Sequence, residues 1–254
     1  MGEPPVSTAR VRELLDPSRL DREPDDSAGY LDLLGDTEEY RRTRAQRAMH
    51  SGLVASIYQR WWRPALTVLL SQGATVEEEG REAVRLLDLG GPMRVLDVAC
   101  GPGNFTRLFA SALSGDGLAV GLDASEPMLA RAVRDNAVPR AGYLRADARR
   151  LPFPTASFDA VCCYAALYLV PEPFTVLSEM LRVLAPGGRL ALMTSLRPDA
   201  EPLRTAASGL AWANGLRLFD REELTGVLRS AGLVDIRQRA GGFAQFVSGR
   251  RPLD

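Results

Sequence analysis

From Pro92 onward, short β-rich runs alternate with segments of helical pattern, and this alternation constrains the fold more than any other feature of the chain. Strands are predicted over residues 94–99, 118–123, 142–147, 158–164 and 188–195. Helices are predicted to begin near Asn104, Ser125 and Pro173. Strands that alternate with helices pair in parallel through right-handed crossovers, with helices on both faces of the sheet. Residues 92–254 are therefore predicted to form an α/β domain.

The C-terminal part departs from this alternation. A helix predicted over 220–230 is followed by strands at 233–240 and 243–250, joined through Gly241 and Gly242. Two strands joined so closely pair antiparallel. We therefore expect a Rossmann-like, seven-stranded, mostly parallel sheet that ends in an antiparallel hairpin. Residues 196–219 show no clear period and are expected to form a substrate lid over the carboxyl ends of the strands.

The part of the chain before Pro92 reads differently. Residues 1–36 are rich in Pro, Asp and Arg and are expected to form a loosely ordered arm. Residues 37–91 have a helical pattern and are expected to form an N-terminal cap. Thr75 and Glu78 have the spacing of a capping box, and Gly90-Gly91 is expected to end the helix that begins there.

The segment VLDVACGPGNFT, residues 95–106, has the form of a buried strand that ends in a glycine turn and opens a helix. Small residues in such a turn let a ligand approach the backbone and the helix N-terminus. Asp123 stands 20 residues after Gly103 at the end of the next predicted strand, where an acid can accept hydrogen bonds from ribose hydroxyls. The alternative is a tight structural turn with a surface aspartate.

Several blocks, in this order, resemble the class I S-adenosylmethionine-dependent methyltransferases over roughly residues 93–250. LDVACGPGNFT resembles the first motif of that family, with Ala99 in place of its usual first glycine. GLDASEPML resembles the ribose-binding block, RADARRLPFPTASFDAV the adenine-side block, and EMLRVLAPGGRLAL the helix, turn and fifth strand. The resemblance implies S-adenosylmethionine as the cofactor and methyl transfer as the reaction.

The resemblance also implies a set of cofactor-binding residues within these blocks. Asp97 would suit the ammonium of the methyl donor and would repel a pyrophosphate, which favours this donor over NAD. Asp147 would face the adenine amino group, and Ala148 would offer its backbone N–H. The whole set consists of Asp97, Ala99, Gly101, Gly103, Asp123, Ala124, Met128, Asp147, Ala148 and Tyr164.

HSGLVASIYQRWWRP and the C-terminal GLVDIRQRAGGFAQFVSGRRP bring the chain closer to a subgroup of small-molecule methyltransferases related to the quinone-ring type, from bacteria and plastids. This likeness implies that Tyr58 or Arg63 reaches the carboxylate of the donor. His50 is a candidate general base, or else a surface or capping histidine. The candidate substrate walls, which ordinary packing explains equally well, are Tyr168, Trp212, Asn214 and Phe219.

The composition of the chain excludes several kinds of catalytic and binding site. All 31 cationic residues are arginine, so the chain has no lysine for a Schiff base or a phosphate loop. One histidine and three cysteines give no pattern for a metal site, and none is expected. A net charge of −1 argues against binding to nucleic acid. With no signal peptide and no long apolar run, we expect a cytoplasmic protein without a membrane span.

The sequence therefore predicts a methyltransferase that acts on a small, apolar or aromatic molecule. One alternative is an enzyme of the same fold that binds the donor but catalyses a cyclisation or decarboxylation. A second is a non-catalytic, donor-binding regulatory protein, and a third is a dehydrogenase. The oligomeric state and the acceptor atom are left open.

Overall fold

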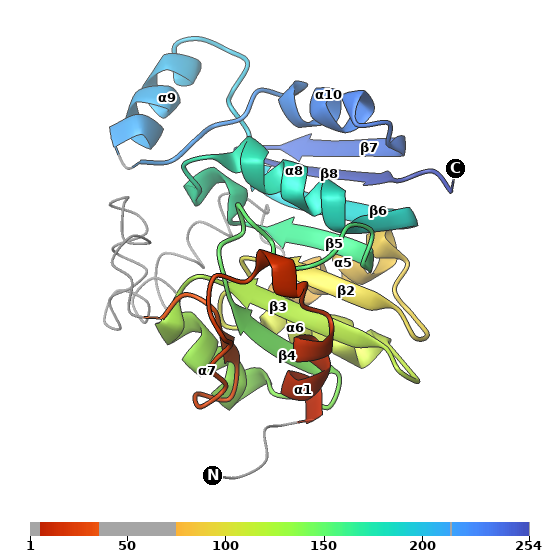
Figure 1. Ribbon diagram of the computed structural model, residues 1–254. Coiled ribbons are helices and arrows are strands. Elements are labelled where there is room, and N and C mark those ends of the chain that lie inside the picture. Colours follow the sequence, from red (N-terminus) through yellow and green to blue (C-terminus); the bar gives the residue numbers. More distant parts are fainter. Residues whose placement is uncertain (1–5, 36–74, 214, 254) are drawn as a thin grey trace.

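The structure is a computed structural model that describes residues 6–35, 75–213 and 215–253. Within these residues, eight strands form one sheet in the order β1-β4-β3-β2-β5-β6-β8-β7 (Figure 1). Strands β1 to β6 are parallel, and β8 runs antiparallel to both β6 and β7. The strands are β1 Leu31–Asp32, β2 Arg94–Val98, β3 Leu118–Asp123, β4 Ala141–Arg145, β5 Phe158–Tyr164, β6 Leu184–Ser195, β7 Val234–Gly241 and β8 Ala244–Arg250.

Helices cover both faces of this sheet. Helices α1, α8 and α10 lie on one face and α5, α6 and α7 on the other (Figure 1). Side chains of β2 alternate between the two layers, because Leu96 and Val98 join the first core and Val95 joins the second. The helices are α1 Val6–Glu13, η1 Pro17–Arg19, α5 Val76–Leu87, α6 Asn104–Ala112, α7 Glu126–Asn136, η4 Leu167–Leu169, α8 Pro173–Val183, α9 Leu203–Ala213 and α10 Glu223–Ser230.

The predicted fold class is confirmed, including the antiparallel C-terminal hairpin. Strands β3 and β5 have the predicted bounds, whereas β6 begins at Leu184, four residues before the predicted start at 188. Part of the predicted lid forms helix α9, although its sequence showed no period. Alanine, glycine and serine make up much of α9, and such small residues give little contrast between an apolar and a polar face.

The N-terminal arm differs most from the expectation of loose order. Val11 and Leu31 are completely buried, and α1 packs against β4. Strand β1 pairs in parallel with β4 and becomes the eighth strand of the sheet, one more than expected. The few apolar residues of the arm cover the sheet at β4. A two-residue strand is too short to show a strand period, so β1 could not be predicted from the sequence pattern.

Of the predicted cap over 37–91, only residues 75–91 lie within the described part of the chain. The capping box at the start of α5 is confirmed, since the Glu78 amide donates to Thr75 Oγ1 and the Thr75 amide to Glu78 Oε2. The helix ends at Leu87, before the expected glycines, because Asp88 adopts the left-handed conformation with φ 54°. None of the described helices is long and apolar enough to cross a membrane.

Candidate functional site

The sheet changes its direction of winding between β2 and β5. From β2 the chain adds β3 and β4 on one side, and β5 and β6 follow on the other. Ligands of open α/β sheets bind outside the carboxyl ends of the strands at such a switch point. Ala99 and Ala165, which directly follow β2 and β5, have φ values of 58° and 57°. This conformation costs a non-glycine residue about 1–2 kcal/mol, and such strain is typical of binding sites.

The two glycines of the turn after β2 serve different purposes. Apart from its two chain neighbours, a Cβ atom added to Gly101 would meet no heavy atom of the described residues within 4 Å, so this part of the chain leaves the turn open. A Cβ atom on Gly103 would lie 2.5 Å from Tyr143 Oη. Both residues have positive φ values, 56° and 79°. Gly101 therefore leaves space for a ligand, whereas Gly103 is required for packing against Tyr143.

Asp123 ends β3 beside this turn. Its Oδ2 atom accepts a hydrogen bond from the Gly101 amide, and its Oδ1 atom accepts one from the Ser125 amide, each at 2.8 Å. Burial raises the pKa of Asp123, although these amide hydrogen bonds oppose the change. Each oxygen can still accept a further hydrogen bond, so the carboxylate suits the vicinal hydroxyls of a ribose.

Asp97 lies beneath the turn, with 2% of its surface exposed. Its Oδ2 atom accepts a hydrogen bond of 2.6 Å from Thr106 Oγ1, and Cys162 Sγ donates to Oδ1 at 3.6 Å. Burial raises the pKa of Asp97 to about 6, even though both hydrogen bonds lower it. The carboxyl group thus connects the end of β2 to α6 and β5. From the sequence, Asp97 was expected to contact the ammonium of the donor. Its two hydrogen-bond partners were not predicted.

Asp147, which was expected to face the adenine, is paired with an arginine that was not predicted as a site residue. Arg149 Nη2 lies 2.7 Å from Asp147 Oδ2, and its Nη1 atom also reaches Glu172 Oε1 at 3.0 Å. The sequence signal for this ion pair is the position of the arginine, two residues after Asp147. Ala148 packs against the core, and Met128 is buried on α7.

The aromatic candidates do not gather at one surface. The Tyr164 ring packs against Phe105 and Phe246, with centroids 5.1 and 6.4 Å away. Its buried hydroxyl has no hydrogen-bond partner in the described part of the chain. Phe219 is completely buried and its ring packs edge-on against Phe174, which fits the ordinary packing named as the alternative to a substrate wall.

The remaining predicted residues are scattered or not described. Tyr168 is buried in η4, and Trp212 on α9 is 84% exposed. His50, Tyr58, Arg63 and Asn214 lie outside the described residues.

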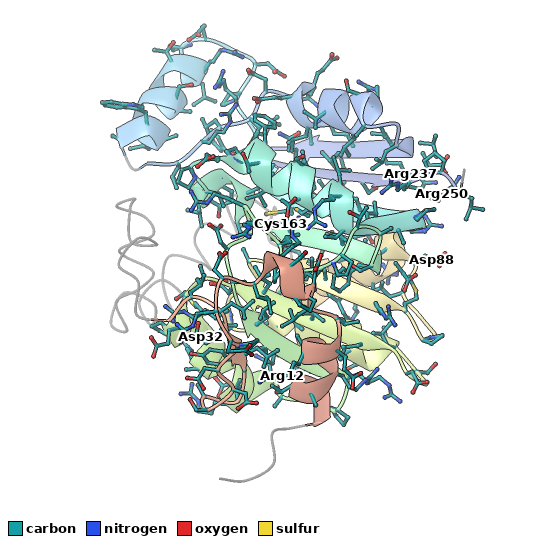
Figure 2. The ribbon with its side chains drawn as sticks, viewed as in Figure 1. Arg12, Asp32, Asp88, Cys163, Arg237 and Arg250 are labelled. Atoms are coloured by element: carbon teal, nitrogen blue, oxygen red, sulfur yellow. The ribbon has the colours of Figure 1, made fainter. Side chains whose placement is uncertain are left out.

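The cysteines belong to the core and not to a reactive site. Cys100, Cys162 and Cys163 are buried free thiols, and Cys163 lies in the middle of the sheet (Figure 2). Burial raises the pKa of Cys163 to about 12. Burial also raises the pKa of Cys100 and Cys162, which disfavours the nucleophilic thiolate at all three positions.

Fold and site together define a doubly wound α/β protein whose candidate site lies at the carboxyl ends of β2 and β3, where the winding of the sheet changes direction. A family model described as a methyltransferase domain matches residues 95–188. The chain is 31% identical over 185 residues to a demethylmenaquinone methyltransferase of Lactococcus lactis, covering 63% of this chain and 73% of that protein. The chain therefore belongs to the class I S-adenosylmethionine-dependent methyltransferases, the family whose cofactor is S-adenosylmethionine.

Two further comparisons agree. An uncharacterized chloroplastic methyltransferase of Arabidopsis thaliana, At2g41040, is 35% identical over 220 residues, or 81% of this chain. The chain spans 61% of that plant protein's length. The fold matches a Haemonchus contortus phosphoethanolamine N-methyltransferase 2 solved with S-adenosyl-L-methionine, with a TM-score of 0.66 and 16% identity, over 81% of this chain and 58% of that one.

Proposed function

We propose that the protein transfers the methyl group of S-adenosylmethionine to a small apolar or aromatic molecule. The observation that carries this proposal is the Asp123 carboxylate, which two backbone amides hold beside the open Gly101 turn at the switch point of the sheet. This arrangement fits a ribose and leaves room for the rest of a nucleoside. The Lactococcus relative, named for a quinone substrate, supports an acceptor with an aromatic ring.

In this proposal, the residues of the crevice bind and orient the donor. Asp123 accepts hydrogen bonds from the ribose hydroxyls, and Asp147 and Ala148 hold the adenine side. Asp97 binds the ammonium of the donor, directly or through water. The cofactor supplies a methyl group already activated on a cationic sulfur, so the protein's task is to align the acceptor and exclude water.

Further roles are proposed from the sequence alone. Tyr58 and Arg63 bind the carboxylate of the donor, and His50 takes a proton from the acceptor. Residues 37–91 act as a cap and 196–219 as a lid over the crevice, with Trp212 and Asn214 at the acceptor.

The charge and the thiols support the choice of acceptor and compartment. A net charge of −1 provides no excess of cations to displace counterions from a nucleic acid, so we propose a small-molecule acceptor. Three buried free thiols fit a reducing compartment such as the cytoplasm.

The test is a transfer assay with S-adenosylmethionine labelled on its methyl group. The purified protein is incubated with a panel of naphthols, phenols and reduced quinones, and in parallel with total RNA. Label is expected in a solvent-extractable small molecule and none in RNA, and the Asp123→Ala variant should transfer much less label than the wild type at a limiting donor concentration. Label in RNA would contradict the acceptor class. Tight donor binding with no label in any product would instead favour the cyclisation or decarboxylation alternative.

A further inference from the structure

Arg145, the last residue of β4, connects the N-terminal arm to the turn that follows Asp123. The arginine is 7% exposed. Its Nη1 atom donates to Asp32 Oδ2 at 2.8 Å and to the Gly35 carbonyl at 2.9 Å. On the other side, its Nε atom donates to the Ala124 carbonyl at 3.2 Å. One buried guanidinium thus joins the arm to the peptide group between Ala124 and Ser125, in the turn after Asp123.

Asp32 is itself held firmly in place. Its Oδ1 atom accepts hydrogen bonds from the Leu34 and Gly35 amides at 2.7 and 3.0 Å, which closes a tight turn after β1. Burial opposes ionisation, but the hydrogen bonds from Gly35, Leu34 and Arg145 keep the pKa of Asp32 below its ordinary value. Asp32 lies at the edge of the sheet where the strands end (Figure 2). Solvent therefore screens the Asp32–Arg145 ion pair only weakly, and the pair lies near the carboxyl ends of the strands.

We propose that the Asp32–Arg145 pair positions the donor site, with both residues acting through the Ala124 carbonyl on the turn that carries Asp123. This inference rests on the proposed function. The carboxylate of Asp123 is oriented by the amides of Gly101 and Ser125. Ser125 follows Ala124 directly, so a shift of the Ala124 peptide group moves one of the two amides that hold the carboxylate.

A second set of contacts from the same arm holds the loop after Asp147. Arg19 donates from Nε to the Leu151 carbonyl at 2.8 Å and from Nη2 to Glu179 Oε2 at 2.7 Å. The Leu151 amide donates to the same Glu179 oxygen at 2.8 Å. The Asp16 amide donates to the Pro152 carbonyl at 2.9 Å. The arm therefore fastens the loops of both acids assigned to the nucleoside, which favours a role in binding over general stability.

The arm also offers a matched control. Arg12 and Asp26 form an ion pair of 2.9 Å within the arm, with side chains 41% and 38% exposed. Within the described residues, the side chains of both hydrogen-bond inside the arm, and neither contacts the turn after β3 or the loop after β4. Neutralising Asp26 thus removes an arm carboxylate and leaves the contacts to the crevice unchanged.

The test measures the dissociation constants of S-adenosylhomocysteine and of adenosine by calorimetry, well below the unfolding temperature. Asp32→Asn is expected to weaken both ligands by the same factor, about tenfold, because only the nucleoside contacts Asp123. Arg145→Lys is expected to weaken both as well, since a single ammonium cannot reach Asp32 and Ala124 together. Asp26→Asn is expected to bind both ligands like the wild type.

A purely structural role would lower the unfolding temperature and leave both dissociation constants unchanged, and this result would overturn the inference. Weakening of S-adenosylhomocysteine without weakening of adenosine would also overturn it, because the effect would then lie at the amino-acid end. If Asp32→Asn does not fold, the Arg145→Lys result decides by the same criteria. A wild type that binds neither ligand would instead refute the proposed function, so the two failures are distinguishable.

Discussion

Replacing Asp123 with alanine removes the residue on which the proposed function depends most. The carboxylate makes two hydrogen bonds within the protein, to the Gly101 and Ser125 amides, and is proposed to make two more to the ribose. Asp123→Ala removes all four acceptor contacts and leaves the backbone of the turn without its anchor.

The expected magnitude follows from these bonds. A hydrogen bond to a charged group contributes about 1.5–3 kcal/mol. Water can replace the carboxylate at the open turn, so the loss is expected to stay near that of one such bond. Donor affinity should therefore fall by about 1.5–3 kcal/mol, or roughly 10- to 150-fold. The unfolding free energy should fall by only about 1–2 kcal/mol, because removing a partly buried carboxylate also removes its desolvation cost.

Calorimetric titration with S-adenosylhomocysteine and urea unfolding measure the two quantities on the same variant. Asp159→Ala is the matched control. Asp159 also accepts a backbone hydrogen bond, from the Arg94 amide at 2.7 Å, but it lies near the start of β5, at the opposite edge of the sheet. This control should lose some stability and keep its donor affinity.

An unchanged dissociation constant for Asp123→Ala, with the protein folded, would refute the assignment and leave Asp123 as a structural residue of the turn. An equal loss of affinity in Asp159→Ala would also refute the reasoning, since the effect would then come from general destabilisation.

Two further predictions concern Asp97 and Ala99. The pKa of Asp97 is raised to about 6 in the folded protein, above its ordinary value of about 3.9. Between these two values the folded protein binds more protons than the unfolded chain. The stabilisation from this group therefore declines as the pH rises from about 4 to 6. Asp97→Asn should abolish this decline in the unfolding free energy, which amounts to up to about 3 kcal/mol. Urea unfolding of the wild type and the variant at pH 4 and pH 6 measures it, and an equal decline in both proteins would contradict the prediction. Ala99→Gly should raise the unfolding free energy by about 0.5–1 kcal/mol, since φ is 58°, whereas Ala130→Gly in helix α7 should lower it by about 1 kcal/mol. Effects of the same sign in both glycine variants would contradict the strain at Ala99.

Part of this protein is determined by local sequence. Alternation of strand and helix patterns, the glycine turn after β2 and the capping box at Thr75 depend on neighbouring residues, so they can be recognised without any tertiary contact. Asp123 was found in the same way, because its distance from the turn follows from the length of one strand–helix–strand unit. These local features were sufficient to predict the fold class, and they also led to the residues proposed for the site.

Other features depend on contacts between residues far apart in the chain. Asp32 and Arg145 are separated by 113 positions, and no periodicity connects them. The partners of Asp97, the burial of Phe219 and the addition of β1 to the sheet likewise arise only when distant segments pack together. The sequence pattern determines which secondary structure each segment prefers. The tertiary structure decides which polar groups meet, because their positions are fixed only once distant segments have packed around the core.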